Sequence, residues 1–116
     1  MPDLAGLSGD ELVAVLSQLA NPHRLRVIAA LSDQRRYVSE LARELGISRP
    51  LLQMHLRRLE QAGIVSSALE ISEDGKALKY YAVEEFELVL SPQALRDKAR
   101  TLTPTTTATH TGDEEQ

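Results

Sequence analysis

The fold is decided by residues 39–48, which read SELARELGIS. Apolar residues recur there at helical spacing and form one stripe, made of Leu41, Ala42 and Leu45. Gly46 supplies the left-handed residue that commonly closes a helix, and Ser48 follows two positions later as the cap of another. Two short helices joined by such a tight turn make a helix-turn-helix, in which the first helix braces the second.

The second helix of this pair is expected over residues 48–62. Pro50 falls in its first turn, where a missing N–H costs little, and Gly63 ends it. Its apolar stripe consists of Leu52, Leu56 and Leu59. When that stripe packs inward, the side chains that face outward are those of Arg49, Pro50, Gln53, Met54 and Arg57.

The outward side chains have chemistry that suits the base edges of double-stranded DNA. An arginine presents a two-pronged donor to guanine, a glutamine pairs with adenine, and a methionine contacts a thymine methyl group. Ser48 and the unpaired N–H groups behind it favour a phosphate at the helix start. The alternative for Arg49, Gln53 and Arg57 is an ordinary solvated helix face, which the helix-turn-helix context makes the weaker interpretation.

Two more helices are predicted before this pair. Residues 8–19 combine a Ser-x-x-Glu capping box with apolar residues at helical spacing. Residues 21–31 begin with Asn-Pro, which ends one helix and starts the next. The inner face of this second helix is expected to carry Leu25, Ile28 and Leu31. Residues 32–35 then form a polar loop, and residues 39–45 form the short third helix.

The pattern changes after the helix-turn-helix and predicts two strands, over residues 64–71 and 78–83. A turn with Asp-Gly at its centre lies between them, so residues 70–80 are expected to form a hairpin wing. Lys76 and Lys79 are expected near a flanking phosphate or the minor groove. The alternative for both lysines is simple solvation, since any hairpin tip carries charge.

The C-terminal part combines an ambiguous segment, a helix and a tail. Residues 85–90 alternate between apolar and acidic side chains, and either a third short strand or a helix start fits them. A last helix is expected over residues 91–102. The predicted fold class is therefore mainly α with a small antiparallel β-hairpin (α+β), a winged helix-turn-helix domain over residues 1–102. Residues 103–116 are rich in threonine and acid, so we expect a disordered tail there.

Composition limits the classes of protein that this chain fits. Its 116 residues suit one domain, and a hydrophobic fraction of 42% is enough for one modest core. Cysteine is absent, which excludes disulfides and thiolate metal sites, and no signal-peptide or membrane-span pattern is found, so we expect a cytoplasmic location. The net charge is −4, yet residues 21–63 carry eight arginines and four carboxylates, a net charge of +4. A basic centre suits a polyanionic partner.

The residues give no support for catalysis or for a bound cofactor. His55 is expected to be a half-buried packing residue, because the other histidines, His23 and His110, do not complete a set of metal ligands with it. The sequence contains neither a glycine-flanked nucleophile nor a glycine-rich phosphate loop. We therefore expect no enzyme activity, no cofactor and no metal.

Several segments resemble the ArsR-type winged-helix regulators over about residues 12–83. The opening LANPHRLRVI (residues 19–28) resembles the family's L-x-x-P-x-R-L-x-I-L. Shorter pieces follow in the family's order: ELA at 40–42, LGIS at 45–48, HL at 55–56, Leu59, AGIV at 62–65 and KYY at 79–81. The resemblance implies a homodimer joined through its first and last helices, which represses transcription by occupying a pseudo-palindromic double-stranded DNA operator.

Two departures from the family's pattern qualify this resemblance. Tyr37 and Ser39 occupy the positions at which metal-sensing members carry paired cysteines, so that metal site is absent. Leu51 and Gln53 stand where members tend to have small polar residues, which favours an unusual operator or weaker direct base reading. An effector is not identified by these residues, and a small organic molecule, a protein or no effector at all remains open.

The sequence therefore predicts a sequence-specific, DNA-binding transcriptional regulator. We expect a homodimeric repressor with helix 48–62 in the major groove and the 70–80 hairpin as its wing. The main alternative is a winged helix that binds a protein, as a co-regulator does. The overall acidity and the apolar side chains of Leu51 and Met54 support that alternative.

Overall fold

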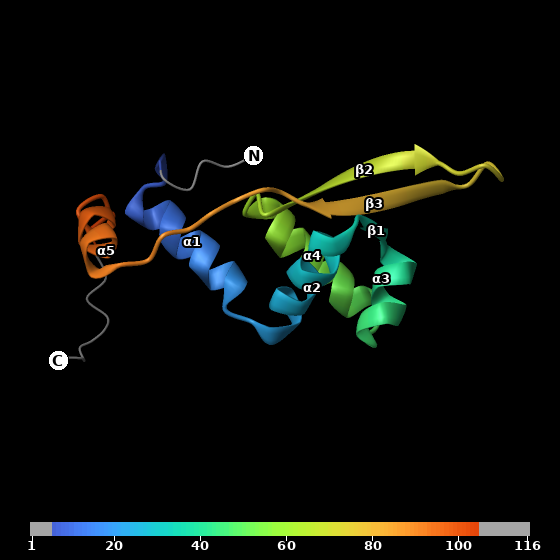
Figure 1. The fold of residues 1–116 in the computed structure, drawn as a ribbon, viewed down its shortest axis with the longest axis horizontal. Coiled ribbons are helices and arrows are strands. Elements are labelled where there is room, and N and C mark those ends of the chain that lie inside the picture. Colours follow the sequence, from blue (N-terminus) through green and yellow to red (C-terminus); the bar gives the residue numbers. More distant parts are fainter. Residues whose placement is uncertain (1–5, 105–116) are drawn as a thin grey trace.

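The computed structural model describes residues 6–104, which form a winged helix-turn-helix (Figure 1). The predicted fold class is confirmed. In chain order the elements are α1 (Gly9–Leu19), α2 (Pro22–Asp33), β1 (Arg36–Tyr37), α3 (Val38–Leu45), α4 (Arg49–Gln61), β2 (Val65–Ile71), β3 (Ala77–Val83) and α5 (Pro92–Ala99).

The helix-turn-helix forms as predicted, with helix ends within one residue of expectation. Gly46 has the left-handed φ of 69° that lets α3 end, and its N–H donates to the carbonyl of Ala42. The Ser48 hydroxyl caps α4 by accepting from the N–H of Leu51 at 3.2 Å, and Pro50 lies in the first turn. Only Ile47 separates the two capping residues, so the turn is tight and α3 packs directly against α4.

The prediction for the buried face of α2 was wrong at one position. Leu25, expected inside, is 55% exposed, whereas Val27 is fully buried. The cause is Arg24, which turns inward and is only 9% exposed because its guanidinium finds acceptors there. With Arg24 and Val27 inside, the 100° step between helix residues turns Leu25 toward solvent.

The sheet contains a strand that the sequence did not predict. β1 has two residues and pairs antiparallel with β3, in the register Arg36↔Tyr81 and Tyr37↔Tyr80. The strand order is β1-β3-β2, so the long strand β3 lies between the other two. Residues 85–90, for which a strand or a helix start was expected, have neither and connect β3 to α5 in an extended path.

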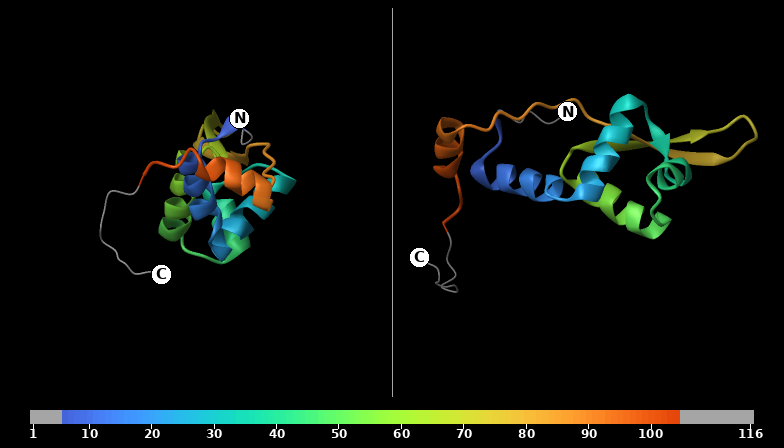
Figure 2. Two further views of the ribbon diagram at one scale, coloured as in Figure 1. Left: turned by 90° about the vertical axis from the view of Figure 1, so that its left-hand side faces the viewer. Right: turned by 60° about the horizontal axis from the view of Figure 1, so that its bottom comes forward.

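The core lies where α2, α3 and α4 meet the base of the hairpin. Its most completely buried side chains are Val27, Leu41, Leu52, Leu56, Leu59 and Ile64. The hairpin extends beyond this core as the wing, and α1 and α5 lie side by side at the opposite end (Figures 1 and 2). The molecule is therefore long, 58 Å against 27 and 21 Å in the other directions.

Polar contacts hold α5 against the start of α1. The Gly9 N–H donates to the Thr101 hydroxyl, and a Cβ at Gly9 would collide with the carbonyl oxygen of Lys98. α5 ends at Ala99 rather than at residue 102, and no residue of α5 is buried. Thr103 was predicted to begin the disordered tail, but its N–H and hydroxyl donate hydrogen bonds to the carboxylate of Asp10. Residues 105–116 of that predicted tail lie outside the described residues.

Truncation of Leu56 tests whether the inner face of α4 is the core. Leu56 is 0% exposed, so Leu56→Ala should lower the free energy of unfolding by about 2–5 kcal/mol through lost burial and a residual cavity. Leu69 is 68% exposed, and Leu69→Ala should change it by less than about 0.5 kcal/mol. Urea denaturation measures both variants, and equal losses would contradict this assignment of the core.

Candidate nucleic-acid interface

The outer face of α4 carries the side chains that the sequence placed there. Arg49, Gln53 and Arg57 are all exposed and recur every four residues, so they lie one above another on one face. Pro50 is exposed beside them, whereas Met54 is only partly exposed. The row therefore consists of two guanidinium groups and an amide between them.

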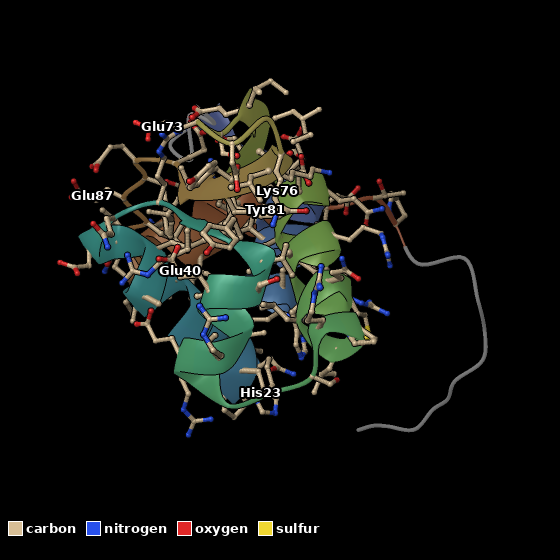
Figure 3. The ribbon with its side chains drawn as sticks, turned by 90° about the vertical axis from the view of Figure 1, so that its right-hand side faces the viewer. His23, Glu40, Glu73, Lys76, Tyr81 and Glu87 are labelled. Carbon is tan, nitrogen blue, oxygen red and sulfur yellow. The ribbon has the colours of Figure 1, made fainter. Side chains whose placement is uncertain are left out.

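A cleft of about 460 Å³ separates this row from the wing. From α4 it is lined by Arg49, Gln53 and Arg57, and from the hairpin by Leu69, Lys79 and Tyr81 among others. The structure thus brings Lys79 to the same hollow as the arginines of α4. Lys76 does not line it and lies in the wing turn, above α3 and α4 in the view of Figure 3.

The N-terminus of α4 lies beside a second, shallower depression. Ser48 and Arg49 line it together with residues of α3 and the turn, including Arg43 and Gly46. Helix starts present unpaired N–H groups, so this depression offers donors and two guanidinium groups to an anion. Ser48 therefore lies at the edge of the α4 surface rather than inside the cleft.

A network around Arg35 braces the wing from its other side. Arg35 pairs with the carboxylate of Glu70 on β2, and its guanidinium lies 4.3 Å from the ring centre of Tyr80. Tyr37 packs edge-on against the same ring, with 5.6 Å between ring centres. On the cleft side, the Ser67 hydroxyl donates to the carboxylate of Glu60 at 2.7 Å. The base of the hairpin is thereby fixed relative to α4.

Comparisons with known proteins agree with this architecture. Residues 21–67 match the family described as "Bacterial regulatory protein, arsR family". An uncharacterised HTH-type transcriptional regulator of Methanocaldococcus jannaschii is 34% identical over 86 residues, which are 74% of this chain and 90% of that protein. The chain belongs to the ArsR family.

Solved structures of similar fold support the same membership for this ArsR-family regulator. One is the homodimeric winged helix-turn-helix DNA-binding domain of a possible ArsR-family regulator from Mycobacterium bovis, with a TM-score of 0.58 and 25% identity, covering 78% of this chain and 70% of that one. Another is the transcriptional repressor BigR from Xylella fastidiosa, with a TM-score of 0.56 and 25% identity, covering 78% and 79%. The protein is thus a winged-helix transcriptional regulator, which implies DNA binding.

Part of the basic charge predicted for the centre of this ArsR-family regulator is paired with groups of the same chain. Arg24 and Arg36 are buried, and Arg36 donates to the carboxylate of Glu44 at 2.9 Å. This hydrogen bond lowers the pKa of Glu44, and the hydrogen bond from Arg35 lowers the pKa of Glu70 in the same way. Three of the eight arginines in residues 21–63 are thus held by structural contacts, which the charge count from the sequence did not reveal.

The wing of the ArsR-family regulator is less cationic and more apolar than the sequence suggested. Leu69 and Ile71 are 68% and 69% exposed, and Leu69 pairs with Lys79 across the strands. The Ser72 hydroxyl donates a hydrogen bond to the carboxylate of Asp74 in the turn. This hydrogen bond lowers the pKa of Asp74, so its carboxylate stays charged. The alternation of side chains along β2 could have predicted this apolar surface, because Leu69 and Ile71 lie on the same face of the strand.

His55 is a packing residue, as predicted, and is more deeply buried than expected at 2% exposure. Its Nδ1 accepts a hydrogen bond of 3.1 Å from Nε of Arg24, a contact that sequence reasoning missed. Burial lowers the pKa of His55, and electrostatic repulsion from the neighbouring basic groups of Arg24, His23 and Arg58 lowers it further.

Neither a metal-binding cluster nor a membrane-spanning helix is found in the part of the chain that the structure describes. Within residues 6–104, no three histidine, aspartate or glutamate side chains lie close enough to hold a metal ion. No helix among those residues is both long and apolar enough to cross a membrane.

Replacement of Glu44 tests the structural use of Arg36. The pKa of Glu44 is lowered in the folded state, so its contribution to stability is present above its unfolded pKa of about 4.3 and lost as the pH falls through the folded value. Glu44→Gln should therefore lower the thermal unfolding midpoint at pH 7 and weaken the acid dependence below about pH 4.3. Glu73→Gln, at the exposed wing turn, should leave both unchanged in the same melting series.

Proposed function

We propose that this ArsR-family regulator is a homodimeric, sequence-specific repressor that occupies a pseudo-palindromic DNA operator. The observation that carries the proposal is the exposed row of Arg49, Gln53 and Arg57 on α4, which faces a cleft shared with Lys79 of the wing. The similar protein BigR is a transcriptional repressor, which supports the direction of regulation proposed here. Such a regulator acts on DNA, so we propose a cytoplasmic location.

In this proposal α4 lies in the major groove and the row reads base edges. Arg49 and Arg57 donate to guanine, and Gln53 pairs with adenine. Met54 and Pro50 supply apolar contacts beside the row, and Ser48 binds a phosphate at the helix start. The lysines Lys76 and Lys79 bind flanking phosphates, which position the protein without reading sequence.

The proposed dimer forms through α1 and α5, at the end of the molecule opposite the wing. Apolar side chains remain exposed there: Val13 (52%), Val89 (66%), Leu90 (54%), Leu95 (43%) and Leu102 (42%). A groove of about 370 Å³ lined by Leu12, Leu88 and Leu95 runs between α1 and α5. The similar domain from Mycobacterium bovis is homodimeric, which supports this arrangement. Residues 1–102 would thus serve both DNA binding and dimerisation, with half-sites roughly 34 Å apart.

The alternative function, a winged helix that binds a protein, has one structural feature in its favour. Leu69 and Ile71 give the wing an exposed apolar face. Leu51 and Met54, which suggested protein binding in the sequence, are both partly buried and therefore offer less apolar surface than expected. A titration with duplex DNA distinguishes the two functions, because only the regulator should bind it in a salt-dependent way.

Titration with duplex DNA over a range of salt concentrations tests the proposal. Binding should weaken steeply with salt, because phosphate contacts release counterions. After selection of bound duplexes from a random pool, Arg49→Ala should cost about 1–3 kcal/mol on the selected sequence and relax preference at one base pair. Lys79→Ala should weaken binding to all sequences equally and reduce the salt slope by about one.

Two results would contradict the proposal. The absence of salt-sensitive binding to any duplex would favour the protein-binding alternative. A uniform loss across sequences in Arg49→Ala, equal to that in Lys79→Ala, would remove the base-reading role of the α4 row.

Charge introduced at the α1–α5 end tests the dimer. Leu95→Asp should shift the protein from dimer to monomer in sedimentation-velocity experiments, because a carboxylate is costly to bury at an apolar interface. Leu69→Asp adds the same charge at the wing and should leave the dimer intact. A dimer that survives Leu95→Asp but dissociates in Leu69→Asp would place the dimer interface at the wing and contradict the proposal.

A further inference from the structure

Arg24 is a buried side chain that connects three helices. It belongs to α2, and its Nη1 donates to the carbonyls of Ser17 and Gln18 at 3.4 and 3.3 Å and to the Gln18 amide oxygen at 2.9 Å. These carbonyls lie in the last turn of α1, where helix geometry leaves them without helical partners and gives them partial negative charge. Its Nε donates to His55 of α4.

The bond from Arg24 to His55 requires a neutral imidazole. Nδ1 accepts a hydrogen bond from the Nε–H of Arg24, so the ring hydrogen is on Nε2, which is buried and has no hydrogen-bond partner among residues 6–104. The titratable and charged groups that act on this ring are all basic: Arg24 and His23 of α2, the latter with 5.4 Å between ring centres, and Arg58 of α4. Arg24 links this ring to α1 through its hydrogen bonds to Ser17 and Gln18.

We propose that Arg24 is a positioning residue that ties the recognition helix α4 to the last turn of α1 through the neutral ring of His55, so that DNA affinity depends on this bond. The inference rests on the proposed function only in naming DNA as the readout. The row of Arg49, Gln53 and Arg57 lies on the opposite face of the helix that carries His55, so a small rotation of α4 moves all three side chains.

Protonation of His55 breaks this tie. The imidazolium carries N–H groups at both ring nitrogens, so Nδ1 no longer accepts, and two donors face each other. Burial and the surrounding cations lower the pKa of His55, so this occurs below about pH 6.5, the ordinary value for histidine. Added positive charge by itself strengthens binding to a polyanion. A weaker complex at acid pH is therefore the mark of lost positioning.

The experiment measures the affinity of the full chain for duplex DNA at pH 7.5 and at the lower pH at which the ring resonances in NMR show His55 to be protonated, both at constant ionic strength. We expect wild-type affinity to fall about 2- to 10-fold on acidification, the equivalent of one hydrogen bond. His55→Asn keeps an acceptor near the position of Nδ1 without a titrating group, and its affinity should stay flat. His23→Gln removes the neighbouring histidine and should keep the fall.

Unchanged or rising wild-type affinity on acidification would overturn the inference, and so would an equal fall in His55→Asn. Far-UV circular dichroism at both pH values checks that each variant remains folded. If the chain binds no DNA at pH 7.5, the proposed function fails separately, and the Arg24 Nε–H resonance decides the inference. Loss of this resonance together with His55 titration then supports the tie, and its persistence contradicts it.

Discussion

Burial of one stripe on α4 is the constraint on which the remaining structure depends. Leu52, Leu56 and Leu59 are all 0% exposed, and each stabilises the fold by roughly 1.5–3 kcal/mol relative to an exposed position. A large rotation of the helix about its axis would bring these side chains into water, so core burial determines which face of α4 points outward. The surface that we propose for DNA is therefore a consequence of core packing, and the hairpin, which packs on the same core, is aligned with it.

Local patterns predicted the helices of this fold well, because their causes lie within a few residues. The left-handed Gly46 and the Ser48 cap act on their own helix ends, and both were identified from sequence. β1 escaped prediction because two residues show no periodicity, and only pairing with the distant β3 makes them a strand. Leu25 was misplaced for a similar reason, since the acceptors that draw Arg24 inward belong to α1 and α4.

The candidate site was predictable in its residues but not in its charge. The outward row of α4 follows from helical periodicity alone, whereas the availability of an arginine depends on partners that only the tertiary structure brings close. Arg35 and Arg36 were counted toward a basic surface, yet they pair with Glu70 and Glu44. The count of eight arginines therefore overstates the positive charge available to a partner, because Arg24, Arg35 and Arg36 already have partners within the fold.

The two ends of the molecule are not independent. Hydrogen bonds of Thr101 and Thr103 join the segment after α5 to the start of α1, and apolar side chains remain exposed at this end, so it gains most from a partner that covers it. The last turn of α1 supplies the acceptors that hold Arg24, and Arg24 in turn holds α4. In the proposed dimer, ordering of α1 would thus also order the recognition helix. Reciprocity then requires that DNA bound to α4 strengthens association at α1 by the same free energy.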